Sequence, residues 1–413
     1  MKVIKRDKSV EVFQVEKIHN AARRAFESCN VDFPDDLKDL LSSLYDENKD
    51  DTVTVEEIQD EVERVLLYNY PEIAKHYIIY RYNHKVIREH KDKIIKGLSK
   101  KLMAQDIENQ NANVDEHSFG GRMGEASRIV TKDYALNYCM SRKSRKNHLN
   151  NEIYIHDLDS YAVGMGNCLT IPFDDLLSNG FKTRQTDVRP ANSINTAFQL
   201  IAVIFQLQSL QQFGGVSSSH LDWTMVPYVR KSFFKHYKDG MECIEDMIWE
   251  DNTIRRIDDE IYKQNKKVYN YAMKMTEKEL KQAVEGMFHN LNTLQSRSGC
   301  QLPFTSINYG TCTSIEGRMV IKALLEGGIK GVGKFHRTSI FPCTIFQLMS
   351  GVNRKEGDPN YDLFKLALKS TSQRLYPNYV NCDWSGNAGY DKNDPRTYMS
   401  TMGKCKCSSS KIF

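Results

Sequence analysis

The segment that most constrains the fold is residues 302–309, which reads Leu-Pro-Phe-Thr-Ser-Ile-Asn-Tyr. Its aromatic and β-branched residues, with turn residues at both ends, predict a short buried strand. We expect its polar members Thr305, Asn308 and Tyr309 to face a cavity, as in the wall of a closed barrel that holds a small polar ligand. A strand of an ordinary sandwich or α/β sheet fits the same residues, so this segment alone leaves both alternatives open.

Helical and extended patterns alternate after this strand. The sequence predicts a helix over 319–325 that ends at Gly327 and Gly328, then a strand over 339–346 and a helix over 362–370. Strand, helix, strand and helix in this order predict an α/β fold with an at least partly parallel sheet.

Several weaker patterns precede that segment. An alternating run predicts a strand over 151–159, and a long apolar run predicts a helix over 192–214. Residues 224–290 read as a charged, helical layer covered by solvent, and the glycine-rich run at 120–124 reads as a loop. The serines at 217–219 either bind phosphate or cap the following helix, and capping is the simpler interpretation.

Composition excludes several classes of protein. The 413 residues include 27% charged and 40% hydrophobic residues, and the formal net charge is +4. A chain of this length is expected to divide into a minor and a major domain. The small net charge predicts no broad basic surface and therefore no direct nucleic-acid partner. Because we find neither an apolar run long enough to span a bilayer nor a signal peptide, we expect no membrane contact and a cytoplasmic location.

Ten cysteines are scattered along the chain without any C-x-x-C pair. They occupy positions 29, 139, 168, 243, 300, 312, 343, 382, 405 and 407. This spacing predicts neither a thioredoxin-type site nor a four-cysteine zinc site. In a reducing cytosol most of these thiols are expected to be buried and to behave as small hydrophobic groups.

A few residues are candidates for chemistry by their position. Cys168 follows two glycines and begins an apolar strand, where its thiol could face a ligand. Cys300 and Cys312 flank the strand at 302–309 and are two further candidates for reactive thiols. His156 and Asp157 form either a metal or acid–base pair or a structural hydrogen bond. With no second histidine nearby, we assign no metal to them.

The first 95 residues have a pattern of their own. Short apolar runs at 3–4 and 10–13 predict a hairpin. Thr54, with Glu57 three residues later, predicts a capping box at the start of a helix. The periodicity predicts three helices in all, starting at Val15, after Thr54 and at about Pro71.

Basic residues gather near this hairpin at Lys5, Arg6 and Lys17. By composition they form either a phosphate site or a solvated basic face. The run Lys5-Arg6-Asp7 and the pair Lys17-Ile18 resemble the opening of the ATP-cone, with Lys8 in place of the usual glycine. The resemblance implies a regulatory site for ATP or dATP, with lysines at the phosphates and Glu11 or Gln14 at the base or sugar. The nucleotide contacts that it implies are Lys5, Arg6, Glu11, Gln14, Lys17 and Thr54.

Segments along the remaining chain resemble the anaerobic, class III ribonucleoside-triphosphate reductases. In order they read PFTSINYGT, EGR, SIFPC, GVN, GDPNYDLF, RLYPNY and DPRTYMSTMG. The resemblance implies a ten-stranded α/β barrel of the glycyl-radical enzyme type, built of two antiparallel five-stranded halves around a finger loop. It divides the chain into an ATP-cone at 1–95, the N-terminal part of the catalytic barrel at 96–403, and an atypical tail at 404–413.

The resemblance also implies a chemistry. Ribonucleoside triphosphates would be reduced to 2′-deoxyribonucleotides by thiyl and glycyl radicals, with formate as the reductant. One cysteine would exchange hydrogen with the ribose, and a second, matched by Cys168, would donate hydrogen as water leaves. Cys405 is the candidate for the first cysteine. Relatives place that cysteine directly after Met-Gly, whereas here Lys404 intervenes.

Further expectations concern substrate and partners. Ser306 and Asn308 would contact the substrate, which leaves Cys300 and Cys312 as wall residues of the cavity. A radical S-adenosylmethionine-dependent activase and a second copy of the chain, as a homodimer, are the implied partners. The zinc site and the glycyl radical are expected in a missing C-terminal part. The alternative is a non-catalytic nucleotide-binding fragment, while a formate-lyase relative is disfavoured because it would lack an ATP-cone.

Overall fold

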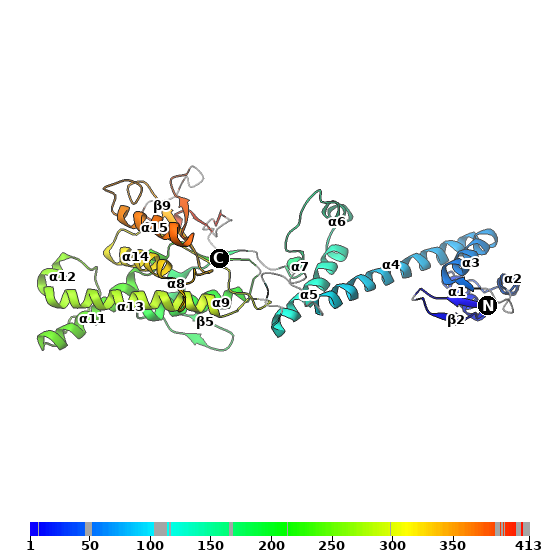
Figure 1. The fold of residues 1–413 in the computed structure, drawn as a ribbon, viewed down its shortest axis with the longest axis horizontal. Coiled ribbons are helices and arrows are strands. Elements are labelled where there is room, and N and C mark those ends of the chain that lie inside the picture. Colours follow the sequence, from blue (N-terminus) through cyan, green and yellow to red (C-terminus); the bar gives the residue numbers. More distant parts are fainter. Residues whose placement is uncertain are drawn as a thin grey trace. The chain divides into compact units, whose positions relative to one another are not determined.

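The computed structural model describes most of the chain. The described residues are 1–6, 8–45, 52–102, 114, 117–164, 168–212, 214–297, 299–384, 389, 391, 393–401 and 406–407. The chain divides into two compact units, Met1–Lys100 and Lys101–Phe413, and each has its own hydrophobic core. Figure 1 labels their helices and strands.

The first unit combines a three-stranded sheet with helices. β1 pairs with β2 in antiparallel register and with β3 in parallel register. The predicted hairpin and the starts of all three predicted helices are confirmed, whereas β3 and α2 were not predicted and the last helix continues well beyond residue 87. The elements are β1 (Lys2–Ile4), β2 (Val10–Val12), α1 (Val15–Glu27), α2 (Asp35–Ser43), β3 (Thr52–Thr54), α3 (Val55–Asn69) and α4 (Pro71–Leu102).

The core of this unit forms where the apolar faces of its helices meet. Phe26 on α1 and Leu66 on α3 are fully buried, and burying each such side chain contributes roughly 1.5–3 kcal/mol. The predicted capping box starts α3, because the Thr54 hydroxyl oxygen accepts from the Glu57 backbone N–H at 3.2 Å and the Glu57 carboxylate accepts from the Thr54 N–H at 2.8 Å.

The second unit is built on a five-stranded sheet in which every pairing is parallel. The strand order is β10-β9-β8-β7-β4. The predicted α/β class with a parallel sheet is therefore confirmed. The strands are β4 (Leu169–Thr170), β7 (Val216–Ser218), β8 (Thr305–Tyr309), β9 (Cys343–Leu348) and β10 (Asn378–Asn381).

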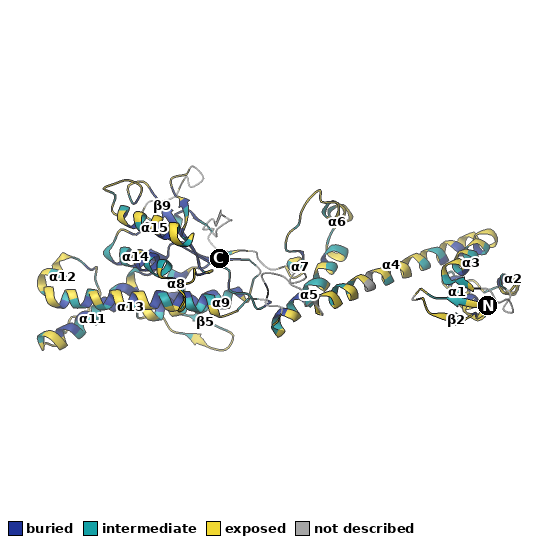
Figure 2. Cartoon of the chain, viewed as in Figure 1, coloured by how far each residue is buried: buried dark blue, intermediate teal, exposed yellow. Residues whose placement is uncertain are grey.

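Long helices pack on one face of this sheet. Their apolar residues meet Val216, Ile307, Tyr309 and Phe346 of the strands in the main core. Figure 2 shows the buried stripes along these helices in dark blue. They are α9 (Ile194–Ser209), α11 (Val226–Glu245), α13 (Lys266–Thr293), α14 (Ile315–Lys330) and α15 (Tyr361–Arg374).

Smaller elements complete the second unit. They are α5 (Phe119–Tyr134), the π-helix η2 (Ala135–Cys139), α6 (Arg142–Leu149), α7 (Leu158–Tyr161), α8 (Phe173–Asn179), β5 (Phe181–Lys182), β6 (Asp187–Val188), α10 (Leu221–Thr224), α12 (Asp259–Gln264), the 3₁₀ helix η4 (Pro395–Thr397), β11 (Ser400–Thr401) and β12 (Lys406–Cys407). β5 pairs with β6, and β11 with β12, in antiparallel register.

Three local predictions about helices and strands are wrong. Residues 151–159 form no strand and instead lead into α7, because Asp157 adopts a left-handed backbone conformation that interrupts an extended run. The glycine-rich run at 120–124 lies inside α5, where the missing side chains allow close packing against the turn at 299–300. Gly327 and Gly328 do not end α14, which continues to Lys330 and stops at Gly331 with φ +72°.

Two predictions about burial also need correction. Residues 224–290 are more than a solvent-covered layer, since α13 buries an apolar stripe that belongs to the main core. Along β8, Tyr309 does not share a face with Asn308. Side chains alternate along a strand, so Thr305, Ile307 and Tyr309 point toward the helices, while Ser306 and Asn308 point to the opposite face.

Candidate functional site

A polar face covers the side of the parallel sheet that the long helices leave open. The register pairs Thr170 with Ser217, and Ser217 with Ser306, so these side chains lie in a row across three strands. Asn308 on β8 and Gln347 on β9 project to the same side. We call these five residues the polar face. Four of them are fully or almost fully buried, and Thr170 is half-buried.

Three atoms of the polar face have no hydrogen-bond partner among the described residues. They are the Ser306 hydroxyl, the Thr170 hydroxyl and the Gln347 carbonyl oxygen Oε1. Buried polar groups are nearly always satisfied, and unpaired ones indicate a place for a ligand or a water molecule. A small molecule carrying hydroxyl groups would match this set of donors and acceptors.

Asn308 is already engaged by the segment that lies across the polar face. Its Nδ2 donates to the Thr401 carbonyl at 3.0 Å, and its Oδ1 accepts from the Thr401 N–H at 3.1 Å. Gln347 Nε2 donates to the Met399 carbonyl at 2.9 Å. The predicted substrate contact Asn308 therefore holds the chain at 398–401 over the sheet, whereas Ser306 keeps its hydroxyl unpaired.

Cys168 lies at the edge of the polar face, two residues before Thr170 and directly before β4, as the sequence indicated. Its thiol lies in the electrostatic environment of Arg297. Burial and the positive charge of Arg128 lower the pKa of Arg297, while Asp157 and Cys168 oppose that shift. The other predicted catalytic cysteine, Cys405, lies outside the described residues. Residues 165–167, which include one of the two glycines that precede Cys168, also lie outside them.

The two cysteines that flank β8 have different environments. Cys312 is fully buried, and burial raises the pKa of its thiol to about 12, which keeps it protonated and unreactive. Cys300 is half-buried in a turn against α5, where its Sγ would lie only 2.7 Å from a methyl group placed on Gly120.

The loop after β8 is fixed from both sides. Asp222, fully buried, accepts hydrogen bonds from the backbone N–H groups of residues 310–312 at 2.9–3.0 Å. Asn353 and Asn360 donate to carbonyl oxygens of the same loop, both reaching that of Gly310 at 3.0 and 3.2 Å. Sequence reasoning missed all three residues, although the GVN and GDPNYDLF segments contain the two asparagines.

A hydrogen-bonded chain of side chains lies at the end of β7. Ser219 Oγ lies 2.6 Å from His220 Nδ1, and His220 Nε2 lies 2.7 Å from Asp174 Oδ2. The Thr224 hydroxyl donates to the other oxygen of Asp174 at 2.7 Å. The predicted capping by the serines is wrong, because the residue that caps α10 is His220 and makes no side-chain cap. Ser217 and Ser218 belong to β7 instead.

The first unit contains a cavity of about 170 Å³ between the hairpin, α1 and α3. Glu11 joins two predicted phosphate ligands, because Lys5 and Lys17 each form an ion pair with one of its oxygens, the latter at 3.0 Å. Hydrogen bonds from Lys5 and then Lys17 lower the pKa of Glu11. The cavity is lined by Val3, Lys5, Glu11, Val12, Phe13, Gln14, Lys17, Ile18, Ala21, Val55, Ile58, Gln59, Val62 and Tyr77.

The remaining two predicted nucleotide contacts have other partners. The Arg6 guanidinium donates to Glu56 at 2.5 Å and to Gln59 at 2.6 Å, and it does not line the cavity. The Thr54 hydroxyl belongs to the capping box of α3. The structure therefore brings together Lys5, Glu11, Gln14 and Lys17, and places Arg6 and Thr54 beside them.

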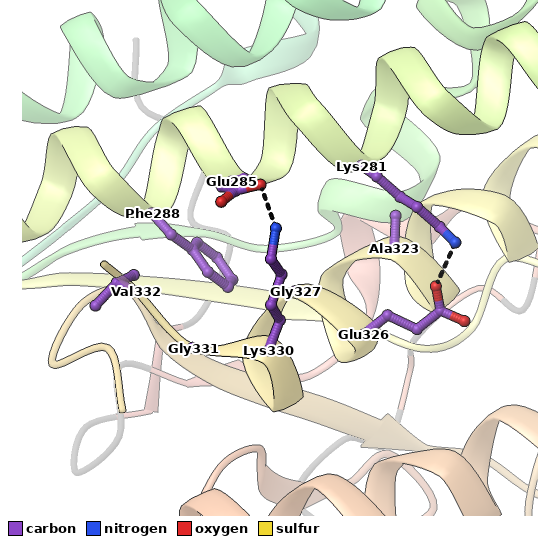
Figure 3. Close-up of a pocket in the computed structure, with 9 residues that line it drawn as sticks. All are labelled: Lys281, Glu285, Phe288, Ala323, Glu326, Gly327, Lys330, Gly331 and Val332. Carbon is purple, nitrogen blue, oxygen red and sulfur yellow. Dashed lines mark hydrogen bonds and ion pairs between the residues drawn. The ribbon is translucent and has the colours of Figure 1, made fainter. Parts of the chain in front are cut away.

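A second cavity of about 210 Å³ lies between α13 and α14, and none of the candidate residues lines it. Figure 3 shows its two ion pairs, Lys281 with Glu326 at 3.0 Å and Lys330 with Glu285 at 2.8 Å. Because each lysine is neutralised by a glutamate of the facing helix, the cavity presents no uncompensated charge. The two ion pairs bridge the facing helices, and as partly exposed pairs each contributes only about 0–1 kcal/mol.

His156 Nδ1 lies 2.5 Å from Asp157 Oδ2, which matches the structural hydrogen bond considered for this pair. Within the described part of the chain, no group of three or more His, Cys, Asp and Glu side chains is arranged to hold a metal ion. Among the same residues, no helix combines the length and the apolar character needed to cross a membrane.

The fold is that of a mixed α/β protein with a small N-terminal unit of three strands and several helices. Residues 1–86 match the family model of the ATP cone domain, and residues 110–410 match that of anaerobic ribonucleoside-triphosphate reductase. The chain belongs to the anaerobic ribonucleoside-triphosphate reductase family.

Individual relatives agree with this assignment. The chain is 31% identical over 392 residues to the anaerobic ribonucleoside-triphosphate reductase of Haemophilus influenzae, covering 92% of this chain and 52% of that protein. It is 32% identical over 387 residues to the Escherichia coli protein of the same name, covering 92% and 51%. The chain thus spans about half the length of the curated relatives it matches.

An anaerobic ribonucleotide reductase from Thermotoga maritima, in complex with dATP and CTP, superimposes with a TM-score of 0.46 at 13% sequence identity. The superposition covers 74% of this chain and 51% of that one.

Proposed function

We propose that this chain provides the effector-binding and substrate-binding parts of an anaerobic ribonucleoside-triphosphate reductase, an oxidoreductase that replaces the 2′-hydroxyl of a ribonucleotide by hydrogen. The observation that carries the proposal is the polar face. It offers the buried, unpaired hydroxyl of Ser306 and the unpaired oxygen of Gln347 beside a cysteine, Cys168, at the edge of the sheet. A ribose, with several hydroxyl groups, supplies the complementary donors and acceptors.

The overall reaction balances with formate as the reductant. Formate loses two electrons and becomes carbon dioxide, while the 2′-hydroxyl leaves as water and a hydrogen takes its place. A thiol is suited to the hydrogen transfer because its S–H bond is weak. Cys168 is proposed to supply the hydrogen that replaces the hydroxyl, and Cys405 to exchange hydrogen with the opposite side of the sugar.

The proposed barrel places these groups around one cavity. The five parallel strands would form one half of a ten-stranded barrel with the polar face inside. The segment at 398–401, held over that face by Asn308 and Gln347, is the proposed start of the finger loop that carries Cys405. Ser306 would then contact the substrate directly, and Asn308 would position the loop.

The first unit is proposed to bind ATP and dATP as allosteric effectors. Lys5 and Lys17 converge on Glu11 at the wall of its cavity, a spacing suited to the successive phosphates of a nucleotide. Gln14 lines the same cavity and is available to the base or sugar. Arg6 and Thr54 would contact the nucleotide only after exchanging their present partners.

We also propose the partners of such an enzyme. A radical S-adenosylmethionine-dependent activase would generate the glycyl radical, and two copies of the chain would form a homodimer. The glycyl radical and the zinc site are proposed to lie in a part of the enzyme that this chain does not span.

The alternative proposal is a non-catalytic nucleotide-binding fragment. It is favoured by a cavity in the first unit whose lining residues all lie within 3–77. ATP binding alone is expected from both proposals, so it does not separate them.

Reconstitution separates the two proposals. The chain is mixed without oxygen with the remaining half of the Haemophilus influenzae relative, an activase, S-adenosylmethionine, formate and CTP. The reductase proposal expects a glycyl-radical signal by electron paramagnetic resonance and formation of dCTP. Cys168→Ser is expected to keep the radical signal and to abolish dCTP formation. A radical signal without dCTP from the unaltered chain contradicts the reductase proposal and supports the fragment.

A further inference from the structure

The chain of side chains at the end of β7 has a defined direction. Asp174 is acceptor-only when ionised, so His220 Nε2 carries a proton and donates it to Asp174 Oδ2 across 2.7 Å. The other ring nitrogen, Nδ1, meets Ser219 Oγ at 2.6 Å. If Nδ1 is protonated it donates to the serine, and if it is not, it accepts the serine O–H. Both states keep the three residues hydrogen-bonded.

The same series of hydrogen-bonded side chains extends from the solvent-exposed Asp174 to the buried Ser219 at the sheet. The side chain of Asp174 is 40% exposed, that of His220 only 10%, and Ser219 as a residue 7%. The carbonyl oxygen of Ser219 accepts from Gln347 Nε2 at 3.3 Å. Gln347 in turn bears one of the unpaired oxygens of the polar face. Ser219, the inner end of this series of side chains, is therefore joined through its backbone carbonyl to a residue of the polar face.

The carboxylate that faces the histidine is ionised. Burial opposes ionisation of Asp174, but hydrogen bonds from His220 and Thr224 lower its pKa overall, so a carboxylate faces the imidazole. The other charged groups that act on this pair are Asp222, Asp394 and Arg396. The carboxylate accepts the hydrogen bond from Nε2 and so fixes the orientation of the imidazole, with Nδ1 turned toward Ser219.

We propose that Asp174, His220 and Ser219 form a proton relay that delivers a proton to a ligand hydroxyl on the polar face. This inference rests on the reductase function proposed above. As the C2′–O bond breaks, its electron pair stays with the oxygen, which takes the proton from Ser219 and leaves as water. Ser219 regains a proton from His220 Nδ1, which leaves a neutral imidazole whose Nε2–H still donates to Asp174. After the product leaves, a water molecule entering the site returns a proton to Nδ1 through Ser219. Cys168 and formate supply the hydrogen and electrons as before.

A purely structural role is the competing explanation. The same hydrogen bonds join α8, which contains Asp174, to α10, which contains Thr224, and would hold the two helices together. A structural role predicts that His220 is indifferent to the presence of a 2′-hydroxyl on a bound nucleotide. A relay predicts the opposite.

The first test needs no turnover. The full chain is labelled with ¹⁵N in its histidines, and the ring signals of His220 are assigned with His220→Gln. CTP at saturation is expected to shift these signals, whereas dCTP, which lacks the 2′-hydroxyl, is expected to leave them near their positions in the nucleotide-free chain. Ser219→Ala is expected to abolish the difference between CTP and dCTP, and Ser219→Thr to restore it.

Calorimetry with CTP distinguishes the possible failures. If CTP binds but shifts His220 no more than dCTP does, the relay is wrong and the proposed substrate site stands. If CTP does not bind the chain at all, the proposed substrate site is wrong and the relay falls with it.

The second test uses the reconstituted enzyme. His220→Gln and Ser219→Ala are each expected to lower kcat for dCTP formation by about 10²-fold, the usual contribution of a positioned proton donor, with the glycyl-radical signal retained. His236→Gln is the matched control, because His236 also pairs with a carboxylate, Glu279 at 2.8 Å, but joins α11 to α13 on the helical side. Equal losses in the control and the relay variants would overturn the proposal.

Discussion

Asp222 holds Gly310 and the two residues after it by their backbone N–H groups, with a single carboxylate oxygen accepting all three hydrogen bonds at 2.9–3.0 Å. The two partners are 88 residues apart in the chain. These hydrogen bonds fix the loop between β8 and α14, which begins at Gly310 with φ +129°. This loop, held by Asp222, therefore connects β8, which carries part of the polar face, to α14, which belongs to the helical core.

Asp222→Asn is expected to destabilise the second unit by roughly 1–3 kcal/mol, because the neutral amide accepts more weakly and brings donors to a site that already holds three. Urea unfolding followed by the fluorescence of Trp223, which donates to Thr311 in the same loop at 2.9 Å, measures the change. Asp187→Asn, at an exposed strand position, is the control and should change stability little. Equal stability of the two variants would contradict the anchoring role.

Asn308→Asp is expected to release the segment at 398–401. The carboxylate oxygen that replaces Nδ2 would face the carbonyls of Ser218 and Thr401, to which the amide now donates at 2.9 and 3.0 Å. Repulsion in place of two hydrogen bonds should cost at least about 2 kcal/mol locally. Hydrogen–deuterium exchange at Thr401 should accelerate by more than tenfold, whereas Asn192→Asp at an exposed site should leave it unchanged.

The ion pair between Arg230 and Glu316 makes stability depend on pH. Burial opposes ionisation of Glu316, but hydrogen bonds from Arg230 at 2.6 Å and from the Ile257 N–H lower the pKa of this carboxyl overall. A lowered pKa in the folded state means that the stabilisation is complete above the ordinary value of 4.5 and is lost as pH falls through the lowered one.

Glu316→Gln tests this linkage. At pH 7 the variant should be less stable by roughly 1.5–3 kcal/mol, the contribution of hydrogen bonds to a charged group. The difference from the unaltered chain should shrink progressively as the pH falls below 4.5, the ordinary pKa of this carboxyl. Urea unfolding at a series of pH values measures it, and a difference that does not vary with pH would refute the assignment.

Lys5→Ala and Lys17→Ala are each expected to weaken ATP binding by about tenfold or more, since a charge-assisted contact to phosphate is worth at least about 1.4 kcal/mol. Calorimetry on the full chain measures the affinity. Lys38→Ala, on the exposed face of α2, is the matched control. Unchanged affinity in both lysine variants would show that ATP binds elsewhere.

Local patterns were sufficient where the partners are close in sequence. The capping box of α3 joins residues three apart, and the ion pairs of Glu11 reach lysines six residues away on either side. Period and spacing therefore predicted the hairpin and the starts of α1, α3 and α4 in the first unit, but not α2. The buried strand predicted over 302–309 is present as β8, which begins three residues later at Thr305, and its aromatic and β-branched residues indicated burial without knowledge of its partners.

Long-range pairing limited the rest. The sequence indicated that polar side chains of β8 face a cavity but grouped Tyr309 with Asn308, although strand alternation separates them. Gly327 and Gly328 were expected to end a helix by their backbone freedom, yet packing against α13 carries α14 past them. Neither error can be recognised from the sequence, because each depends on a strand or helix that packs against the segment in the folded protein.

The sequence by itself determined the family, the α/β class and the short-range chemistry of the hairpin, because these depend on residue order and on neighbours a few positions apart. Only the tertiary structure decided which distant residues form hydrogen bonds: Asp174 with His220, Asp222 with the Gly310 N–H, and Asn308 with the backbone of Thr401. Parallel strands require long crossover connections, so the partners on one sheet face come from segments tens of residues apart, and their register exists only once the sheet has formed.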